Sequence, residues 1–156
     1  VMSEYSAKLI WTRGKHEPFN DNKYSRGHRW EFDGGAVVQA SSSPNIVPTP
    51  YSVEANVDPE EAFVASLSSC HMLFFLAIAG KQKFVVDKYL DNPVGTMEKG
   101  TDGKISITKV RLRPKVIFSG NQPSFEQLTK MHHQSHEQCF IANSVKSEVV
   151  TEIITD

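Results

Sequence analysis

Cysteine is scarce in this chain, because only Cys70 and Cys139 occur among its 156 residues. Neither belongs to a C-x2-C pair, so the usual pattern of a structural zinc site is missing. The first residues contain no basic segment followed by an apolar run, so we expect no secretory signal and a cytoplasmic protein. A permanent structural disulfide is rare there, which leaves inert buried thiols, metal ligands or a working redox pair.

An excess of charge of either sign is also absent. The chain has 17 Lys and Arg against 18 Asp and Glu, and a formal net charge of -1. Its basic residues are scattered and form no run with interleaved aromatic residues, so we expect no nucleic-acid partner. With 39% apolar and 22% charged residues the composition is that of a globular protein, and we predict a single domain over 1–156.

The clearest predicted element is a helix that begins after Asp58. This aspartate suits the cap, Pro59 the first helical position, and Glu60 and Glu61 the positive end of the helix dipole. The residues up to a stop signal at Gly80 are almost continuously apolar. Serines and a histidine in the middle disfavour a membrane span, so we expect no membrane partner. A helix buried on nearly all sides of a soluble protein, between two subunits, fits better.

Alternating segments predict the strands on either side of that helix. We expect a strand over 4–13, a hairpin over 28–41 that turns at Asp33-Gly34-Gly35, an irregular connection over 41–57, strands within 83–100 and 102–120, a second helix from Ser124, and a last strand over 146–155. Phe125, Leu128, Met131 and Ser135 are expected on the buried stripe of the second helix. The order predicts an α+β fold with helices packed on antiparallel sheet.

Three histidines and a cysteine gather in HHQSHEQC, residues 132–139. In a helix His132, His136 and Cys139 share one face, and zinc accepts such ligands. A metal-binding module is therefore one interpretation of this segment. A polar helix face with an inert buried cysteine is a second, and a redox partner for Cys70 is a third. The histidines His28, His71 and His133 receive no role from the sequence.

Three blocks of sequence resemble the OsmC/Ohr family of thiol-dependent peroxidases. DPEEAFVASLSSCHM is similar to the family's helix start, with a cysteine ten positions after the first Glu. RGHRWEFDGGAV is similar to its early arginine-containing hairpin, and HEQCFIANSVK to the segment with the second cysteine. The resemblance covers the chain from about residue 24 onward. Phe140 departs from it, since the family commonly has proline after the second cysteine.

The resemblance implies roles for four residues. Cys70 corresponds to the peroxidatic cysteine and Cys139 to the resolving one. Arg26, with Arg29 as the neighbouring alternative, would stabilise the Cys70 thiolate, and Glu60 would be the acidic partner of that arginine. The implied reaction reduces organic hydroperoxides through a Cys70 sulfenic acid and a Cys70–Cys139 disulfide, with a thiol reductant such as a lipoyl-type dithiol and no cofactor.

The helix geometry adds an expectation about assembly. On a straight helix Glu60 lies about 15 Å from Cys70 along the axis, so it reaches the thiol only through the arginine or from a partner subunit. We therefore expect an intertwined homodimer with the apolar helices at its centre. The apolar side chains around Cys70 would line a substrate pocket or belong to an ordinary core; they are Met72, Leu73, Phe74, Phe75 and Phe140.

Overall fold

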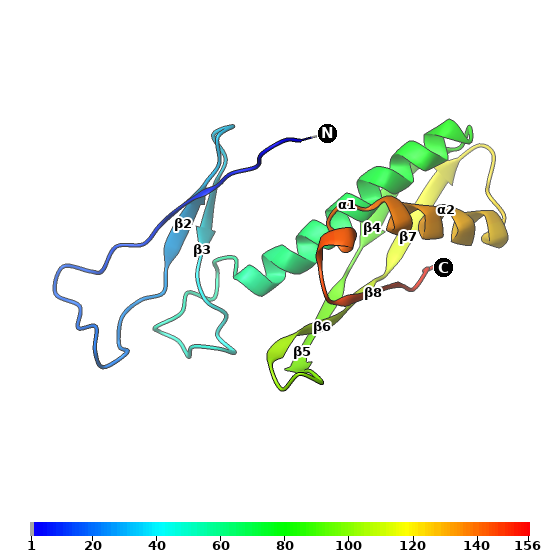
Figure 1. Ribbon diagram of the computed structural model, residues 1–156. Helices are drawn as coiled ribbons and strands as arrows, with labels where there is room; N and C mark the ends of the chain where they lie inside the picture. Colours follow the sequence, from blue (N-terminus) through cyan, green and yellow to red (C-terminus); the bar gives the residue numbers. More distant parts are fainter. Residues whose placement is uncertain (1) are drawn as a thin grey trace. The chain divides into compact units, whose positions relative to one another are not determined.

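The computed structural model describes residues 2–156. Over this range the elements are β1 (Lys8–Ile10), β2 (His28–Glu31), β3 (Val37–Ala40), α1 (Pro59–Lys81), β4 (Val85–Asp91), β5 (Val94–Lys99), β6 (Ile105–Leu112), β7 (Pro114–Ser119), α2 (Phe125–Gln138), the 3-10 helix η1 (Ala142–Ser144) and β8 (Glu148–Thr151) (Figure 1). The chain divides into two compact units, one that ends at Ala62 and one that comprises Phe63–Asp156. The predicted α+β fold is confirmed, whereas the single domain stays a prediction.

The first unit contains the antiparallel sheet β1-β2-β3. The predicted hairpin joins β2 to β3, and Gly35 takes the positive φ of 100° that its turn requires. The first strand is shorter than predicted. It ends at Ile10 because the next residue, Trp11, turns into an aromatic cluster with Phe19 and Tyr24 and donates its Nε1–H to the Ser25 carbonyl at 2.9 Å.

The irregular connection over 41–57 is held by hydrogen bonds to small polar residues. Backbone bonds of 3.0 Å join Ser41 to Val57 and Val57 to Gln39, and the buried Ser41 hydroxyl accepts the Val53 N–H at 2.9 Å. These bonds replace a regular strand ladder and deliver the chain to the start of α1.

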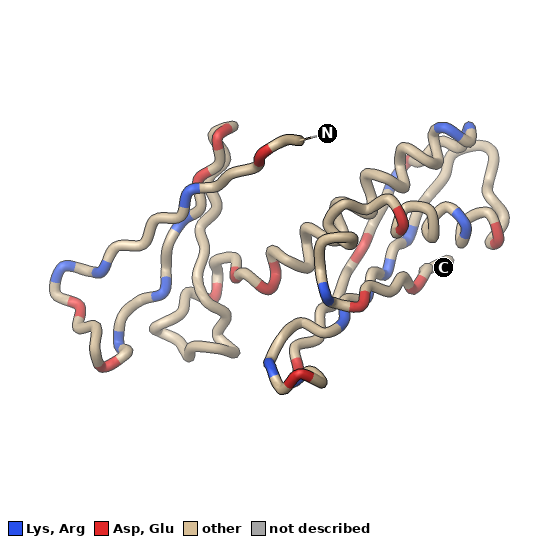
Figure 2. Tube along the Cα trace, in the orientation of Figure 1, with Lys and Arg blue, Asp and Glu red and all other residues tan. Residues whose placement is uncertain are grey.

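The predicted start of α1 is confirmed, and its end differs by a few residues. Asp58 Oδ1 accepts the Glu61 N–H at 2.8 Å and Glu61 Oε1 accepts the Asp58 N–H at 3.1 Å, which makes a capping box. The helix passes Gly80, and the left-handed residue that ends it is Lys83 with a φ of 71°. The chain turns there because Phe84 enters the core. Figure 2 shows α1 without charge between its first turn and Lys81.

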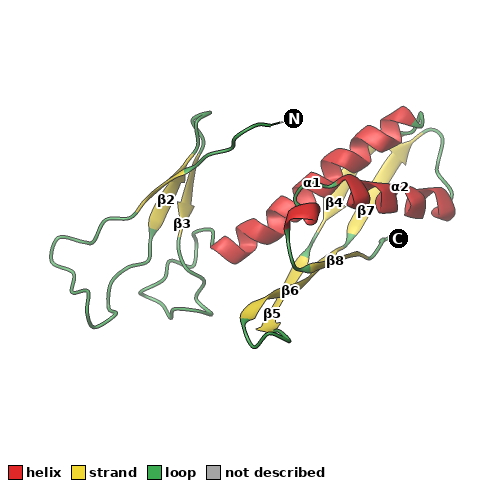
Figure 3. Cartoon of the chain, in the orientation of Figure 1, coloured by secondary structure: helices red, strands yellow, loops and turns green. Residues whose placement is uncertain are grey.

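The second unit contains two antiparallel strand pairs, which belong to two separate sheets (Figure 3). Strand β4 pairs with β7, and β5 pairs with β6. The chain passes from one strand pair to the other after Asp91 and again at Arg113, and it bends there. The Asp91 carboxylate holds this bend to the helix, since it accepts hydrogen bonds from the Ser68 hydroxyl at 2.5 Å and the Arg113 N–H at 2.6 Å. Strand β8 pairs with β6 in parallel, so this sheet is mixed and not purely antiparallel as predicted.

The core of the second unit lies against a single stripe of α1. Its buried residues recur every four positions, and they are Leu67, His71, Phe75 and Ala79. The rest of the helix is apolar but largely uncovered within this chain, as Leu73 with 59% exposure illustrates. Among residues 2–156, α1 has the length and apolar character of a membrane span, a property shared with core helices of soluble proteins.

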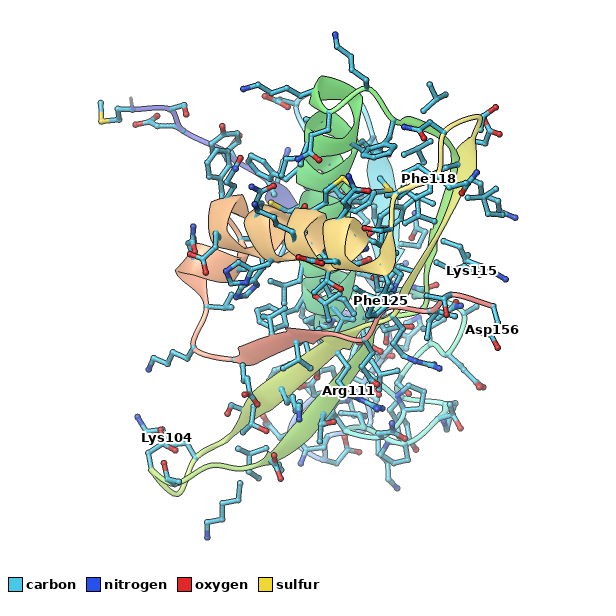
Figure 4. The ribbon with its side chains drawn as sticks, turned by 90° about the vertical axis from the view of Figure 1, so that its right-hand side faces the viewer. Lys104, Arg111, Lys115, Phe118, Phe125 and Asp156 are labelled. Atoms are coloured by element: carbon cyan, nitrogen blue, oxygen red, sulfur yellow. The ribbon has the colours of Figure 1, made fainter. Side chains whose placement is uncertain are left out.

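The second helix packs through Met131, His132 and Ser135 and begins at the predicted Ser124 cap, which forms a capping box with Gln127. The prediction that Phe125 lies on its buried stripe is wrong. Phe125, labelled at the start of α2 in Figure 4, is 62% exposed. Phe118, on β7, belongs instead to the core cluster with Phe75, Phe84 and Met131.

Candidate functional site

The two thiols are brought together by the two helices of the second unit. Cys70 lies half-buried in the middle of α1, and Cys139 is buried at the end of α2. Both are free thiols, and they lie close enough for Cys70 to raise the pKa of Cys139. Their role as a redox pair stays a prediction.

Burial raises the pKa of the Cys139 thiol to about 11, and its hydrogen bond with Cys70 contributes to the increase. The Ala142 N–H donates to Cys139 Sγ at 3.4 Å and acts in the opposite direction. Cys139 therefore rests as a neutral thiol at neutral pH.

The local chain path explains how Cys139 comes to face α1. The Cys139 N–H closes the last turn of α2 on the His136 carbonyl at 3.3 Å, and the Cys139 carbonyl accepts the Asn143 N–H at 3.0 Å. The helix end and η1 thus hold the cysteine backbone from both sides. Its side chain has little freedom to leave the interface between the two helices.

A buried pair of histidines lies beside the thiols and was not foreseen from the sequence. His71 Nε2 and His132 Nδ1 are 2.9 Å apart, so one imidazole donates an N–H to the other. The rings are almost coplanar at 8°, and His132 stacks on Phe75 with ring centroids 4.3 Å apart. His132 Nε2 is buried without a partner among the described residues, as is the Tyr89 hydroxyl.

Both histidines are neutral in the folded protein. Burial lowers the pKa of His71 to about 4, with a smaller contribution from His136. Burial also lowers the pKa of His132 to about 3, with a smaller contribution from His71. A signal for His132 existed in the sequence, because it lies next to Met131 and four residues after Leu128 on the same helical stripe. Its partner is 61 residues away, and no spacing indicates it.

The expected metal ligands do not form a ready coordination set. Within residues 2–156, no group of three or more histidine, cysteine, aspartate or glutamate side chains could hold a metal ion. His132 turns its Nδ1 to His71, His136 is half-buried, and the Cys139 thiol faces Cys70. His133 lies on the exposed side of α2, where its Nε2 is 3.8 Å from Glu137.

The apolar side chains proposed around Cys70 separate into two groups. Phe75 belongs to the core, the second of the two expected alternatives, because it is fully buried with Tyr89 and Phe118. Phe74 lies one turn after Cys70 and packs edge-on against Phe140, with ring centroids 5.1 Å apart. Phe140 remains 71% exposed, so this aromatic pair presents apolar surface one turn after Cys70 and one residue after Cys139.

The expected charged partners belong to the first unit. Arg26 lies over the Tyr24 ring, with Cζ 3.6 Å from the centroid, and donates to the Asn22 carbonyl at 2.8 Å. Arg29 instead binds Glu31 at 2.7 Å, and this hydrogen bond lowers the pKa of Glu31. Glu60 is half-buried in the first turn of α1. Of the two arginines, only Arg29 has a carboxylate partner among the described residues.

Known proteins share this architecture. A family model described as OsmC-like protein matches residues 53–154. A solved OsmC-like protein of unknown function from Vibrio cholerae is 64% identical, with a TM-score of 0.97 over 98% of this chain and 100% of its own. No curated protein sequence matches the chain.

Two more distant structures share the fold. An organic hydroperoxide resistance protein from Elizabethkingia anophelis is 12% identical, with a TM-score of 0.69 over 99% of both chains. The organic hydroperoxide resistance protein OhrB of Bacillus subtilis is 18% identical, with a TM-score of 0.65 over 97% of this chain and 98% of its own. The family match and the close Vibrio relative together establish that this chain belongs to the OsmC family.

Proposed function

We propose that this protein is a cysteine-based peroxidase that reduces organic hydroperoxides in the cytoplasm. The observation that carries the proposal is the proximity of two free thiols, Cys70 in the middle of α1 and Cys139 at the end of α2, where Cys70 raises the pKa of Cys139. Two free thiols that lie near each other can close a disulfide. The names of the Elizabethkingia and Bacillus structures agree with such a substrate.

In the proposed reaction the Cys70 thiolate attacks the outer oxygen of the peroxide and breaks the O–O bond. The sulfur gains a hydroxyl group, and the other oxygen leaves as the alcohol after it takes a proton. The Cys139 thiol then attacks the Cys70 sulfenic acid, a disulfide forms, and water leaves. A dithiol reductant returns two electrons and two protons, and both cysteines become thiols again.

Cys139 supports this sequence because its own thiol remains protonated until the sulfenic acid exists. A pKa of about 11 keeps it from competing with Cys70 for the peroxide. It lies close enough to condense with the oxidised Cys70 before a second peroxide arrives. The cysteine that attacks the peroxide must be accessible, and the cysteine that condenses with the sulfenic acid can be buried. Cys70 is half-buried and Cys139 is buried.

Arg26 is the cation that we assign to the Cys70 thiolate. Arg29 is already neutralised by Glu31, whereas the Arg26 guanidinium contacts an aromatic ring and backbone carbonyls. Glu60 would orient this guanidinium in the assembled protein. The uncovered apolar side of α1 supports a homodimer with α1 at its centre, which would complete the site.

Organic hydroperoxides are favoured over hydrogen peroxide because the surface beside the thiols is apolar. The Phe74–Phe140 pair offers aromatic faces to an alkyl or aryl group next to Cys70. Truncating Phe140 should therefore raise the KM for a bulky hydroperoxide more than the KM for hydrogen peroxide.

The test uses two substitutions and a count of thiols. Cys70→Ser should abolish hydroperoxide consumption, whereas Cys139→Ser should allow one turnover and leave a sulfenic acid that dimedone labels. In the parent protein, one equivalent of cumene hydroperoxide should reduce two free thiols per chain to none without cross-linking chains. Ser66→Ala, on an exposed position of α1, is the control for nonspecific damage to the helix.

Normal turnover in Cys70→Ser would refute the peroxidase. Elemental analysis of the same preparation addresses the metal-binding alternative, because a module built on His132, His136 and Cys139 would retain about one zinc per chain. Sedimentation at micromolar concentration addresses the homodimer, which a single monomeric species would contradict.

A further inference from the structure

The second helix touches the first at two polar points. At one point Cys139 lies near Cys70, and at the other His132 forms a hydrogen bond with His71. Cys70 and His71 are consecutive in α1, whereas His132 and Cys139 are seven residues apart along α2. Seven residues are nearly two full helical turns, so the two α2 side chains lie on the same face about 10.5 Å apart along its axis.

The histidine contact has a direction that an apolar contact lacks. A hydrogen bond needs its donor and acceptor aligned, and here the two rings are within 8° of one plane at 2.9 Å. Stacking of His132 on Phe75 blocks rotation of that ring. The pair therefore fixes both the distance between the helices and the rotation of α2 about its own axis.

The rotation of α2 decides where the Cys139 sulfur lies. One residue corresponds to 100° around a helix, so a modest rotation would carry Cys139 away from Cys70. The core contacts of Met131 and Leu128 are apolar and tolerate small rotations, because such contacts have no preferred angle. Among the described residues, the side-chain hydrogen bond between α1 and α2 is that of the histidines.

The histidine pair does not add to stability in an obvious way. It keeps two polar rings in an apolar core and leaves His132 Nε2 buried without a partner. An apolar pair of similar volume would fill the same space without an unpartnered polar atom. A buried polar contact of this kind is known to specify the register of packed helices at some expense of stability.

From these observations we propose that the His71–His132 hydrogen bond is a positioning contact that holds Cys139 in register with Cys70. The inference rests on the proposed pairing of the two thiols. Its consequence is a high effective concentration of one thiol toward the other, which favours the intramolecular disulfide over further oxidation of Cys70. His71 and His132 are positioning residues, because neither contacts the peroxide.

The experiment measures that effective concentration without peroxide. The reduced protein is equilibrated with oxidised and reduced glutathione, so that its two thiols form one disulfide and oxidised glutathione yields two reduced molecules. His132→Leu and His71→Leu should each lower the effective concentration about tenfold, since a net hydrogen bond corresponds to about that factor. Both variants replace histidine with an apolar side chain of similar size.

Two conservative variants separate hydrogen bonding from packing. The amide of asparagine reaches the position of Nδ1, and that of glutamine reaches the position of Nε2. His132→Asn and His71→Gln should therefore stay within about threefold of the parent, because each preserves the bond. Met131→Ala is the matched control, since it lowers the melting temperature by damaging the same helix face but leaves the histidine bond intact.

Two results would overturn the proposal. One is a His132→Leu effective concentration within about twofold of the parent, and the other is an equal loss in Met131→Ala. If the leucine variants do not fold, His71→Asn replaces them, because its shorter amide stays polar but cannot reach His132. The same loss is then expected, and its absence counts against the proposal. Failure of the peroxidase would appear separately, as hydroperoxide turnover in Cys70→Ser.

Discussion

The two units of this protein bury different kinds of side chain. The first unit encloses small and polar residues, which are Ala40, Ser41, Ser43, Ser52 and Asp58. The second encloses large apolar residues in two clusters, around Phe75 and around Leu67 with Leu112. The first unit is therefore held mainly by directed hydrogen bonds and the second mainly by apolar burial. The same division separates the proposed charged partners from the thiols.

The largest difference between the units should appear on truncation of a buried aromatic residue. Phe75→Ala removes a fully buried ring and should lower the free energy of unfolding by about 3–5 kcal/mol. Leu9→Ala, at a 65% exposed position of the first unit, should change it by less than about 0.5 kcal/mol. Urea unfolding followed by circular dichroism measures both, and similar losses in the two variants would contradict the comparison.

A second difference concerns acid. His71 and His132 have folded pKa values of about 4 and about 3, below their ordinary value of 6.5, so the unfolded chain takes up protons first. Their contribution is complete above pH 6.5 and is lost progressively as the pH falls toward 4. We expect this part of the unfolding free energy to decrease steadily across that window, because each histidine of the unfolded chain binds a proton that the folded chain takes up only at lower pH.

The control for this acid effect is the double variant His71→Gln/His132→Asn, which keeps a hydrogen bond but cannot take up the protons. Its unfolding free energy, measured by urea titration at each pH between 7 and 4, should decline less steeply than that of the parent. Parallel curves for the two proteins would assign the acid sensitivity to carboxylates elsewhere.

The division of charges in the first unit predicts unequal roles for two arginines. Arg26→Ala should slow hydroperoxide reduction about tenfold to a hundredfold, because it removes the cation assigned to the thiolate. Arg29→Ala should stay near the parent rate, since Glu31 already binds that guanidinium. Stopped-flow measurement of peroxide consumption compares them, and the reverse order would transfer the role to Arg29.

The smallest effect should come from an ion pair on the surface of the second unit. Arg111 binds Glu152 at 3.1 Å, with both side chains nearly half exposed. Arg111→Ala should lower the unfolding free energy by about 0.2–1 kcal/mol, and less at high salt. A larger loss of unfolding free energy would mean that the unit in which a residue lies, and not how deeply it is buried, determines the effect of its substitution.

Local signals in the sequence predicted both helices and the β2–β3 hairpin, whereas the two strands expected between the helices are four, β4 to β7. The start of α1 is indicated by Asp58, Pro59 and Glu61, and the start of α2 by Ser124 with Gln127. Such starts are visible in the sequence because capping involves residues only three positions apart. The parallel pairing of β8 with β6 was not predictable in this way, because no local pattern distinguishes it from antiparallel pairing.

The candidate site was predictable only in part. The two cysteines stand out because there are no others, and the family resemblance paired them. The partner of His71 was hidden, because a hydrogen bond between distant segments leaves no trace in spacing. Likewise Phe75 and Phe74 are adjacent and equally apolar, yet one enters the core and the other meets Phe140, which only packing determines.

The parallel pairing of β8 with β6 has a consequence for synthesis of the protein. Strand β6 can pair with β5 as soon as their hairpin leaves the ribosome, but its other edge must wait for Glu148–Thr151. Cys139 precedes β8 by only a short connection, so it is fixed near Cys70 at the same late stage. Until then the nascent chain carries Cys70 as a thiol without its proposed partner, so a sulfenic acid formed on it during translation would be open to a second peroxide and to oxidation to the sulfinic acid.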